Sequence, residues 1–130
     1  MIDTSAWIEF FRPGGDSTIK SLVKDHLLNG QAAFPCPVRY ELMLGARPNE
    51  LEDLQETLDV SRRIQVTPDH WDEASQRGAD LRAKGLNFPA IDILIATVAC
   101  SEKIPLLAKD AHFEMIRVNS MPELQIIVPN

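Results

Sequence analysis

The 130-residue sequence lacks the features that mark several large classes of protein. It has only two cysteines, Cys36 and Cys100, which excludes a disulfide framework and favours a reducing, cytoplasmic setting. Its longest apolar stretch, residues 93–100, is interrupted by Thr97 and is far shorter than the ~20 residues of a membrane span. Asp3 stands where a secretory signal peptide would carry basic residues, so we expect neither secretion nor membrane insertion.

Positive charge is also scarce, because 13 Lys and Arg residues face 19 Asp and Glu residues and give a net charge of −6. This balance disfavours a protein that holds nucleic acid by bulk positive charge, but it leaves room for binding through metal ions and a local basic patch. Hydrophobic residues make up 45% of the chain and charged residues 25%, which are ordinary values for a globular protein. At this length we expect a single domain over residues 1–130 with a core of its own.

Several motifs that carry chemistry are absent as well. There is no zinc signature, because the cysteines and the histidines are isolated from one another along the chain (His26, His70 and His112). Neither GxxxxGK[ST] nor GxGxxG occurs, which excludes the common nucleotide-binding loops. Ser5 does not lie in a G-x-S-x-G turn, which disfavours a serine hydrolase. The segment Asp3-Thr4-Ser5 offers neither the paired acids of a phospho-acceptor receiver nor the D-x-D of a dehalogenase-like phosphatase.

Short apolar segments that read as strands alternate with helical segments along the whole chain. The strands are predicted at residues 1–2, 32–34, 64–66, 105–108 and 125–128. Helices are predicted to begin near residues 4, 17, 38, 50, 68, 89 and 111, after capping residues or prolines. This alternation is typical of βαβ units, so the sequence predicts one α/β domain with a mostly parallel sheet covered by helices on both faces.

Four acidic residues stand out because they do not lie on obviously solvated faces. Asp3 and Asp110 directly follow the first and fourth predicted strands. In open parallel sheets, ligands bind outside the carboxyl ends of the strands, where the strand order reverses. Asp92 is the one charge in an otherwise apolar helix, and Glu41 lies within the helix predicted over residues 38–44. A carboxylate in such apolar surroundings is costly unless a cation or hydrogen-bond donors meet it.

Each of these residues also has a plain structural interpretation. Asp3 and Asp110 could cap helices, Asp92 could be stabilised by the dipole of its helix, and Glu41 could be a solvated helix residue. Their joint placement is more informative, because three element ends and one helix face could bring four carboxylates into one cleft. Such a cluster repels itself unless cations lie within it, and an all-oxygen set selects hard divalent cations such as Mg²⁺ or Mn²⁺.

The segments that contain these residues resemble one known family. They are Asp3-Thr4-Ser5-Ala6-Trp7-Ile8, Tyr40-Glu41-Leu42, Ile91-Asp92-Ile93-Leu94-Ile95-Ala96 and Leu107-Ala108-Lys109-Asp110-Ala111-His112-Phe113. In this order and at these separations they resemble the PIN-domain family, and most closely the VapC-type toxins of prokaryotic toxin–antitoxin pairs. The resemblance implies a single-domain α/β/α sandwich around a short parallel sheet. It also implies a catalytic metal site made of Asp3, Glu41, Asp92 and Asp110.

The resemblance further implies a Mg²⁺- or Mn²⁺-dependent endoribonuclease that hydrolyses RNA, transfer and ribosomal RNA among the candidates, through a metal-activated water. The hydroxyl of Thr4 or Ser5 would orient Asp3 or that water. Four cations near these segments are candidates for contact with RNA, namely Lys109, Arg39, Arg82 and Lys84. The implied partners are a second copy of the chain and a small antitoxin protein that plugs the cleft.

The chain departs from the family pattern at two places. Only Met1 and Ile2 precede Asp3, where the family has a longer first strand, so a start codon further upstream remains open. Ala108 stands where the family often has Thr or Ser, which removes a hydroxyl near Asp110. These departures keep an alternative open, namely a catalytically silent PIN-like module that binds RNA or protein and holds a structural cation.

Overall fold

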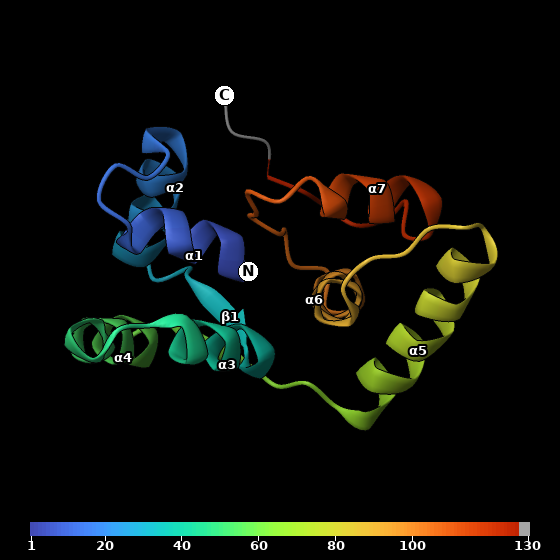
Figure 1. Ribbon diagram of the computed structural model, residues 1–130, viewed down its shortest axis with the longest axis horizontal. Helices are drawn as coiled ribbons and strands as arrows, with labels where there is room; N and C mark the ends of the chain where they lie inside the picture. The colour runs from blue at the N-terminus through green and yellow to red at the C-terminus, as the bar shows by residue number, and fades with distance from the viewer. Residues whose placement is uncertain (128–130) are drawn as a thin grey trace.

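The computed structural model describes residues 1–127. Along the chain its helices and strands are α1 (Thr4–Phe11), α2 (Ser17–Leu28), β1 (Ala33–Pro35), α3 (Cys36–Gly45), the 3-10 turn η1 (Pro48–Glu50), α4 (Leu51–Asp59), β2 (Arg62–Ile64), α5 (Pro68–Ala83), α6 (Ala90–Ser101) and α7 (His112–Asn119). Figure 1 shows α1 to α4 with β1 in one half of the molecule and α5, α6 and α7 in the other.

Parallel pairing runs through the middle of the fold. β1 pairs with β2, Ala33 opposite Arg62, and the Ile2 N–H donates to the carbonyl of Ala33 at 2.8 Å. On the other side of Ile2, isolated parallel bridges join Ile2 to Leu107 and Leu106 to Ile126. The spatial order along the sheet is therefore third, second, first, fourth and fifth segment. The order reverses between the first and fourth segments, which is where parallel sheets bind ligands.

Local sequence explains where the helices near this point begin. The Asp3 carboxylate accepts from the Ser5 N–H and caps α1, and Asp16 caps α2 by accepting from the Ile19 N–H. Thr67 caps α5, and the Nδ1 of His70 accepts from the Thr67 N–H at 2.9 Å in the place that a glutamate usually takes in a capping box. Proline occupies the first turn of α5, where its missing N–H costs nothing.

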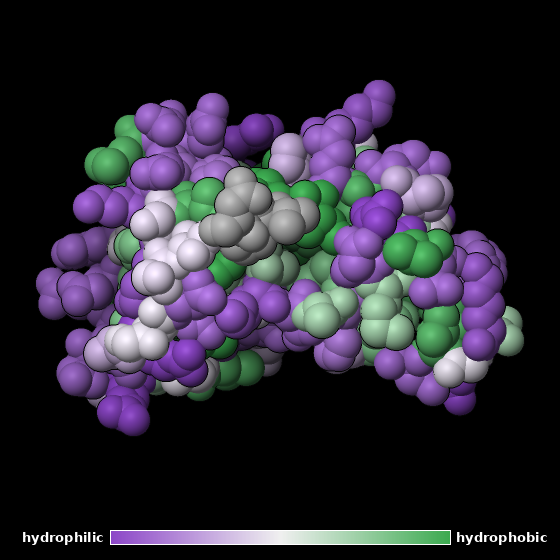
Figure 2. Space-filling model, turned by 90° about the horizontal axis from the view of Figure 1, so that it is seen from above, coloured by the Kyte–Doolittle hydropathy of each residue, from purple (hydrophilic) through white to green (hydrophobic). Residues whose placement is uncertain are grey.

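The core is built around α6, in which every residue from Ile93 to Ala99 is buried. Thr97, the polar residue of this run, satisfies its hydroxyl by donating to the Ile93 carbonyl at 2.7 Å. The first sheet segment is equally enclosed, since Met1, Ile2 and Asp3 are all buried. Hydrophilic side chains dominate both ends of the face shown in Figure 2, and hydrophobic ones gather towards its middle. No helix of the described residues is long and apolar enough to cross a membrane.

The predicted α/β class with a short parallel sheet is confirmed, but several predicted boundaries are wrong. The third strand was predicted at residues 64–66 and lies at Arg62–Ile64, because the Arg62 N–H pairs with the Ala32 carbonyl. The helix predicted from residue 38 begins at Cys36, directly after Pro35. The segments 1–2 and 105–108 form single bridges at Ile2, Leu106 and Leu107 rather than full strands. The last segment bridges at Ile126, and its predicted end at Val128 lies outside the described residues.

Candidate metal centre

Asp3 lies at the carboxyl end of the first sheet segment and is only 3% exposed. Its Oδ2 accepts from the Ser5 N–H at 2.9 Å and from the Ser5 hydroxyl at 2.6 Å. Burial raises the pKa of the Asp3 carboxyl to about 6, against the lowering effect of the Ser5 hydrogen bonds, and the charge of Asp92 raises it further. The fold therefore holds a carboxylate rigidly in a place where its charge is poorly solvated.

Ser5 links Asp3 to the loop that carries Asp110. While its hydroxyl donates to Asp3, the same oxygen accepts from the Lys109 N–H at 2.9 Å and from the Asp110 N–H at 3.3 Å. This contact is possible because the first and fourth sheet segments are neighbours, with the Asp3 N–H bonded to the Leu107 carbonyl. Of the two predicted hydroxyls, Ser5 thus contacts Asp3 directly and fixes the spacing between two of the predicted acids.

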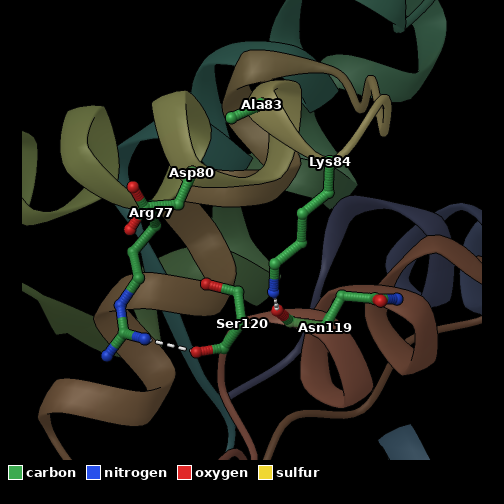
Figure 3. A pocket seen from close by; sticks show the side chains of 6 residues that line it. All are labelled: Arg77, Asp80, Ala83, Lys84, Asn119 and Ser120. Atoms are coloured by element: carbon green, nitrogen blue, oxygen red, sulfur yellow. Dashed lines mark hydrogen bonds between the residues drawn. The ribbon is translucent and has the colours of Figure 1, made fainter.

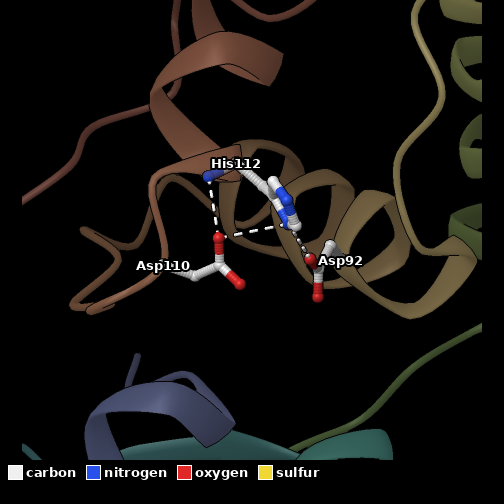
Figure 4. A group of neighbouring side chains, drawn as sticks. All are labelled: Asp92, Asp110 and His112. Atoms are coloured by element: carbon white, nitrogen blue, oxygen red, sulfur yellow. Dashed lines mark hydrogen bonds and ion pairs between the residues drawn. The ribbon is translucent and has the colours of Figure 1, made fainter.

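Asp92 and Asp110 meet across the histidine that begins α7. Asp92 lies in the first turn of α6, and burial raises the pKa of its carboxyl. The Nδ1 of His112 lies 3.0 Å from an Asp92 oxygen and 3.1 Å from an Asp110 oxygen, so the ring stands between the two carboxylates (Figure 4). The hydrogen bond with Asp92 raises the pKa of His112. Ligand atoms of these three residues all lie within 4.8 Å of one another.

Glu41 approaches this region from α3. Its Oε1 accepts from the Thr4 hydroxyl at 2.7 Å, so it contacts the residue that follows Asp3. Thr4, the second predicted hydroxyl, therefore positions Glu41 rather than Asp3. Neither Glu41 nor Asp3 belongs to the tight group of Asp92, Asp110 and His112. Asp3 is coupled to that group by the charge of Asp92, whereas Glu41 is held by Thr4 at the start of α1.

Two of the four cations predicted to contact RNA are paired with groups outside the acidic cluster. Lys109 pairs with Asp16 at 2.9 Å, and Lys84 donates to the Asn119 carbonyl at 2.5 Å. Arg39 is two residues from Glu41 on α3, which places the two side chains about 200° apart around the helix, and its Nη1 is buried without a partner. Arg82 is exposed near the end of α5. Contact of these residues with RNA stays a prediction.

A separate hollow of about 360 Å³ lies between the end of α5 and the end of α7. Arg77 and Lys84 line it, and both donate to backbone carbonyls at the end of α7, those of Ser120 and Asn119 (Figure 3). Because these cations satisfy the open carbonyls of a helix terminus, their contacts here are structural. None of the predicted acidic residues lines this hollow.

The charges at the acidic cluster fit a divalent cation. Among residues 1–127, no lysine or arginine forms an ion pair with Asp3, Asp92 or Asp110, and the basic side chain that contacts Asp92 and Asp110 is the imidazole of His112. Two of these carboxyls have raised pKa values because burial disfavours their charged forms. Oxygen ligands whose charge is not offset by the protein are the donors that Mg²⁺ and Mn²⁺ prefer.

His112 is the residue of this site that the sequence reasoning missed. In the sequence it stands alone, because no cysteine or histidine lies at zinc-ligand spacing from it. The available signal was its place two residues after Asp110, at the first turn of a helix. There its own N–H donates to an Asp110 oxygen at 2.9 Å, which brings the ring beside that carboxylate.

Comparison with known proteins gives a family and a fold. The chain is similar to VapBC2 from Rickettsia felis bound to a promoter DNA fragment (TM-score 0.74, 21% identity, 98% of this chain and 96% of that one covered). It is also similar to DNA-bound VapBC from Salmonella typhimurium (TM-score 0.79, 17% identity, 98% of this chain and 95% of that one covered). A third similar structure is FitAcB from Neisseria gonorrhoeae (TM-score 0.74, 17% identity, 98% of this chain and 96% of that one covered). No curated protein sequence matches it. A model of the PIN domain matches residues 1–119, so the expected family is confirmed and the chain belongs to the PIN domain family.

Proposed function

We propose that the chain is a metal-dependent endoribonuclease that acts in the cytoplasm as the toxin of a toxin–antitoxin pair, with residues 1–130 as one PIN-like domain. The observation that carries the proposal is the arrangement of three acids where the strand order reverses: Ser5 links Asp3 to the Asp110 loop, and Asp92 and Asp110 both contact His112. Among residues 1–127, none of the three forms an ion pair with a lysine or arginine. Family membership supports a nuclease. The fold shared with VapBC and FitAcB supports the toxin role.

In this proposal Asp3, Asp92 and Asp110 hold a Mg²⁺ or Mn²⁺ ion, with Glu41 at the border of the site. The ion supplies a Lewis acid that polarises the phosphodiester and lowers the pKa of the attacking water. Ser5 keeps Asp3 and the Asp110 loop at a fixed distance, and the Thr4 hydroxyl holds the Glu41 carboxylate beside the start of α1. Fixed carboxylates lose little freedom when an ion or a phosphate arrives, which is how preorganised sites lower a barrier.

The proposed partners follow from the same charges. A small antitoxin would insert a basic side chain among the acidic residues, where it meets poorly solvated carboxylates. The solved relatives include VapBC complexes, which supports a protein partner of this kind. A homodimer of the chain completes the proposed assembly.

The test is cleavage of total and transfer RNA by the purified chain with Mg²⁺, Mn²⁺ or EDTA. We expect cleavage with either metal, none in EDTA, and none with Asp92→Asn. That variant should keep its melting temperature in metal-free buffer or raise it, because it removes a partly buried charge. Asp25→Asn, at an exposed position of α2, is the matched control and should cleave normally.

A folded protein that binds the metal and cleaves neither RNA contradicts the nuclease and supports the catalytically silent module instead. A marked fall in the melting temperature of Asp92→Asn without metal contradicts the metal site, since it assigns Asp92 a structural role. Cleavage that persists in EDTA contradicts metal dependence.

A further inference from the structure

We propose that His112 is itself a ligand of the divalent cation, through Nδ1, beside Asp92 and Asp110, and that it makes the centre prefer Mn²⁺ to Mg²⁺. This inference rests on the proposed function, because it concerns the same metal site. It replaces the all-oxygen cluster expected from the sequence with a site that contains one nitrogen donor.

The distances carry the assignment. Nδ1 lies 3.0 Å from an Asp92 oxygen and 3.1 Å from an Asp110 oxygen. Neighbouring ligands of an octahedral ion with bonds of about 2.1 Å are about 3 Å apart. The nitrogen therefore already stands at the separation of a neighbouring ligand from each of the two oxygens, and ligand atoms of all three residues lie within 4.8 Å of one another. Figure 4 shows the Asp92 and Asp110 carboxylates both next to the imidazole ring.

The ring is held in this place from two sides. The N–H of His112 donates to Asp110, which fixes the start of α7 against that carboxylate. Phe88 packs against the imidazole in an edge arrangement, with ring centroids 5.7 Å apart. Metal ligation needs the Nδ1 lone pair, so a ligand histidine carries its proton on Nε2. The side chain is 41% exposed, so the ring can lose the Nδ1 proton to solvent, or take up the Nε2 proton from it, when the ion binds.

Ligand chemistry then sets the preference between ions. Mg²⁺ binds oxygen donors and seldom accepts nitrogen, whereas imidazole suits transition metals. We expect the chain to bind Mn²⁺ about tenfold or more tightly than Mg²⁺. Removing the nitrogen donor should weaken Mn²⁺ binding about tenfold and change Mg²⁺ binding by about twofold at most.

The decisive experiment is electron spin echo spectroscopy of Mn²⁺ added to the full chain, since this method detects ¹⁴N directly bonded to the ion. We expect ¹⁴N coupling in the unmodified protein, its loss in His112→Asn, and its retention in His26→Asn. His26 is the matched control because its Nδ1 is bonded to the Leu22 carbonyl within α2. Calorimetric titration of Mn²⁺ and Mg²⁺ on the same three proteins gives the ratio of affinities.

Bound Mn²⁺ without ¹⁴N coupling in the unmodified protein overturns the inference, whether or not His112→Asn folds. An unchanged ratio of Mn²⁺ to Mg²⁺ affinity in a folded His112→Asn protein overturns it too. In both cases RNA cleavage with metal leaves the proposed function standing. Absence of Mn²⁺ binding to the unmodified chain at millimolar concentration overturns both proposals together.

Discussion

Replacing Asp3 by Asn should stabilise the metal-free protein at neutral pH, although Asp3 is buried and its carboxylate accepts two hydrogen bonds from Ser5. Asn keeps an oxygen that accepts from the Ser5 N–H and hydroxyl, and it is as good a helix cap as Asp. The substitution therefore removes the charge and leaves the hydrogen-bonding role in place. What is lost is the cost of holding a negative charge in a site that is 3% exposed.

The magnitude follows from the pKa of Asp3, which is about 6 in the folded chain against an ordinary value of 3.8. A difference of about two pKa units corresponds to about 3 kcal/mol in the free energy of unfolding at pH 7. Asn gives weaker hydrogen bonds than a carboxylate, so we expect the variant to gain about 1–3 kcal/mol at that pH.

The sign of the pH dependence is fixed by the same shift. Between pH 3.8 and pH 6 the folded protein binds more protons at Asp3 than the unfolded chain does. The contribution of Asp3 to stability therefore falls as pH rises through this window and stays low above it. The difference in free energy of unfolding between Asp3→Asn and the unmodified chain should be largest above pH 6 and should shrink as pH falls towards 4.

Urea unfolding in EDTA at several pH values between 4.5 and 8 measures this difference. Asp16→Asn is the control of opposite sign, because the Ile19 N–H and then the Lys109 ammonium lower the pKa of Asp16. Its charged form is stabilised by the fold, so this variant should be less stable at neutral pH, and the difference should disappear as pH falls through the folded pKa. A destabilised Asp3→Asn protein at pH 7.5, or a pH-independent difference, refutes the reasoning.

Four further substitutions test the link at Ser5 and the packing of two glycines. Ser5→Ala removes the hydroxyl between Asp3 and the Asp110 loop, so RNA cleavage should fall about tenfold or more and the free energy of unfolding by about 1–2 kcal/mol. Ser5→Thr restores a hydroxyl and should recover part of the activity. Equal loss of activity in both variants contradicts a positioning role for Ser5. Gly15→Ala places a Cβ 2.0 Å from the Glu9 carbonyl oxygen, so urea unfolding should show a loss of about 1–3 kcal/mol. Gly45→Ala, which meets open space at the end of α3, should be neutral or gain up to about 1 kcal/mol, and similar losses in both glycine variants would contradict the steric argument.

The sequence was sufficient to predict that Asp3 and Asp110 lie near each other, because both follow segments at the carboxyl edge of a parallel sheet, and the structure joins them through Ser5. It was less informative about the sheet itself. The alternation Ile64-Gln65-Val66 looks like a strand, yet pairing stops at Ile64. The first segment ends at Asp3, which caps α1, and it pairs with the fourth segment through a single bridge at Ile2. Pairing of this kind depends on a few backbone bonds that residue patterns do not encode.

The partners of the lysines could not be predicted from their neighbours in the sequence. Lys109 is next to Asp110 in sequence, but its ammonium pairs with Asp16, 93 residues away. Lys84 reaches the Asn119 carbonyl, 35 residues away. A long side chain can pair with any charged or polar group within its reach, and tertiary packing determines which groups those are. His112 escaped the sequence reasoning for the same reason, since its partner Asp92 is 20 residues distant.

The features that make the acidic site costly in the metal-free chain are the ones that give it affinity for cations. Asp3 has to be buried to hold its place at the end of the first sheet segment and to cap α1, and burial raises its pKa. A cation at the site removes that penalty only in the folded state, so the free energy recovered appears as binding energy and as added stability. Any cation of suitable size can gain this binding energy at the site. A metal ion and a basic side chain from an antitoxin therefore compete for the same favourable interaction with these carboxylates. Adding Mn²⁺ should weaken the binding of such a partner.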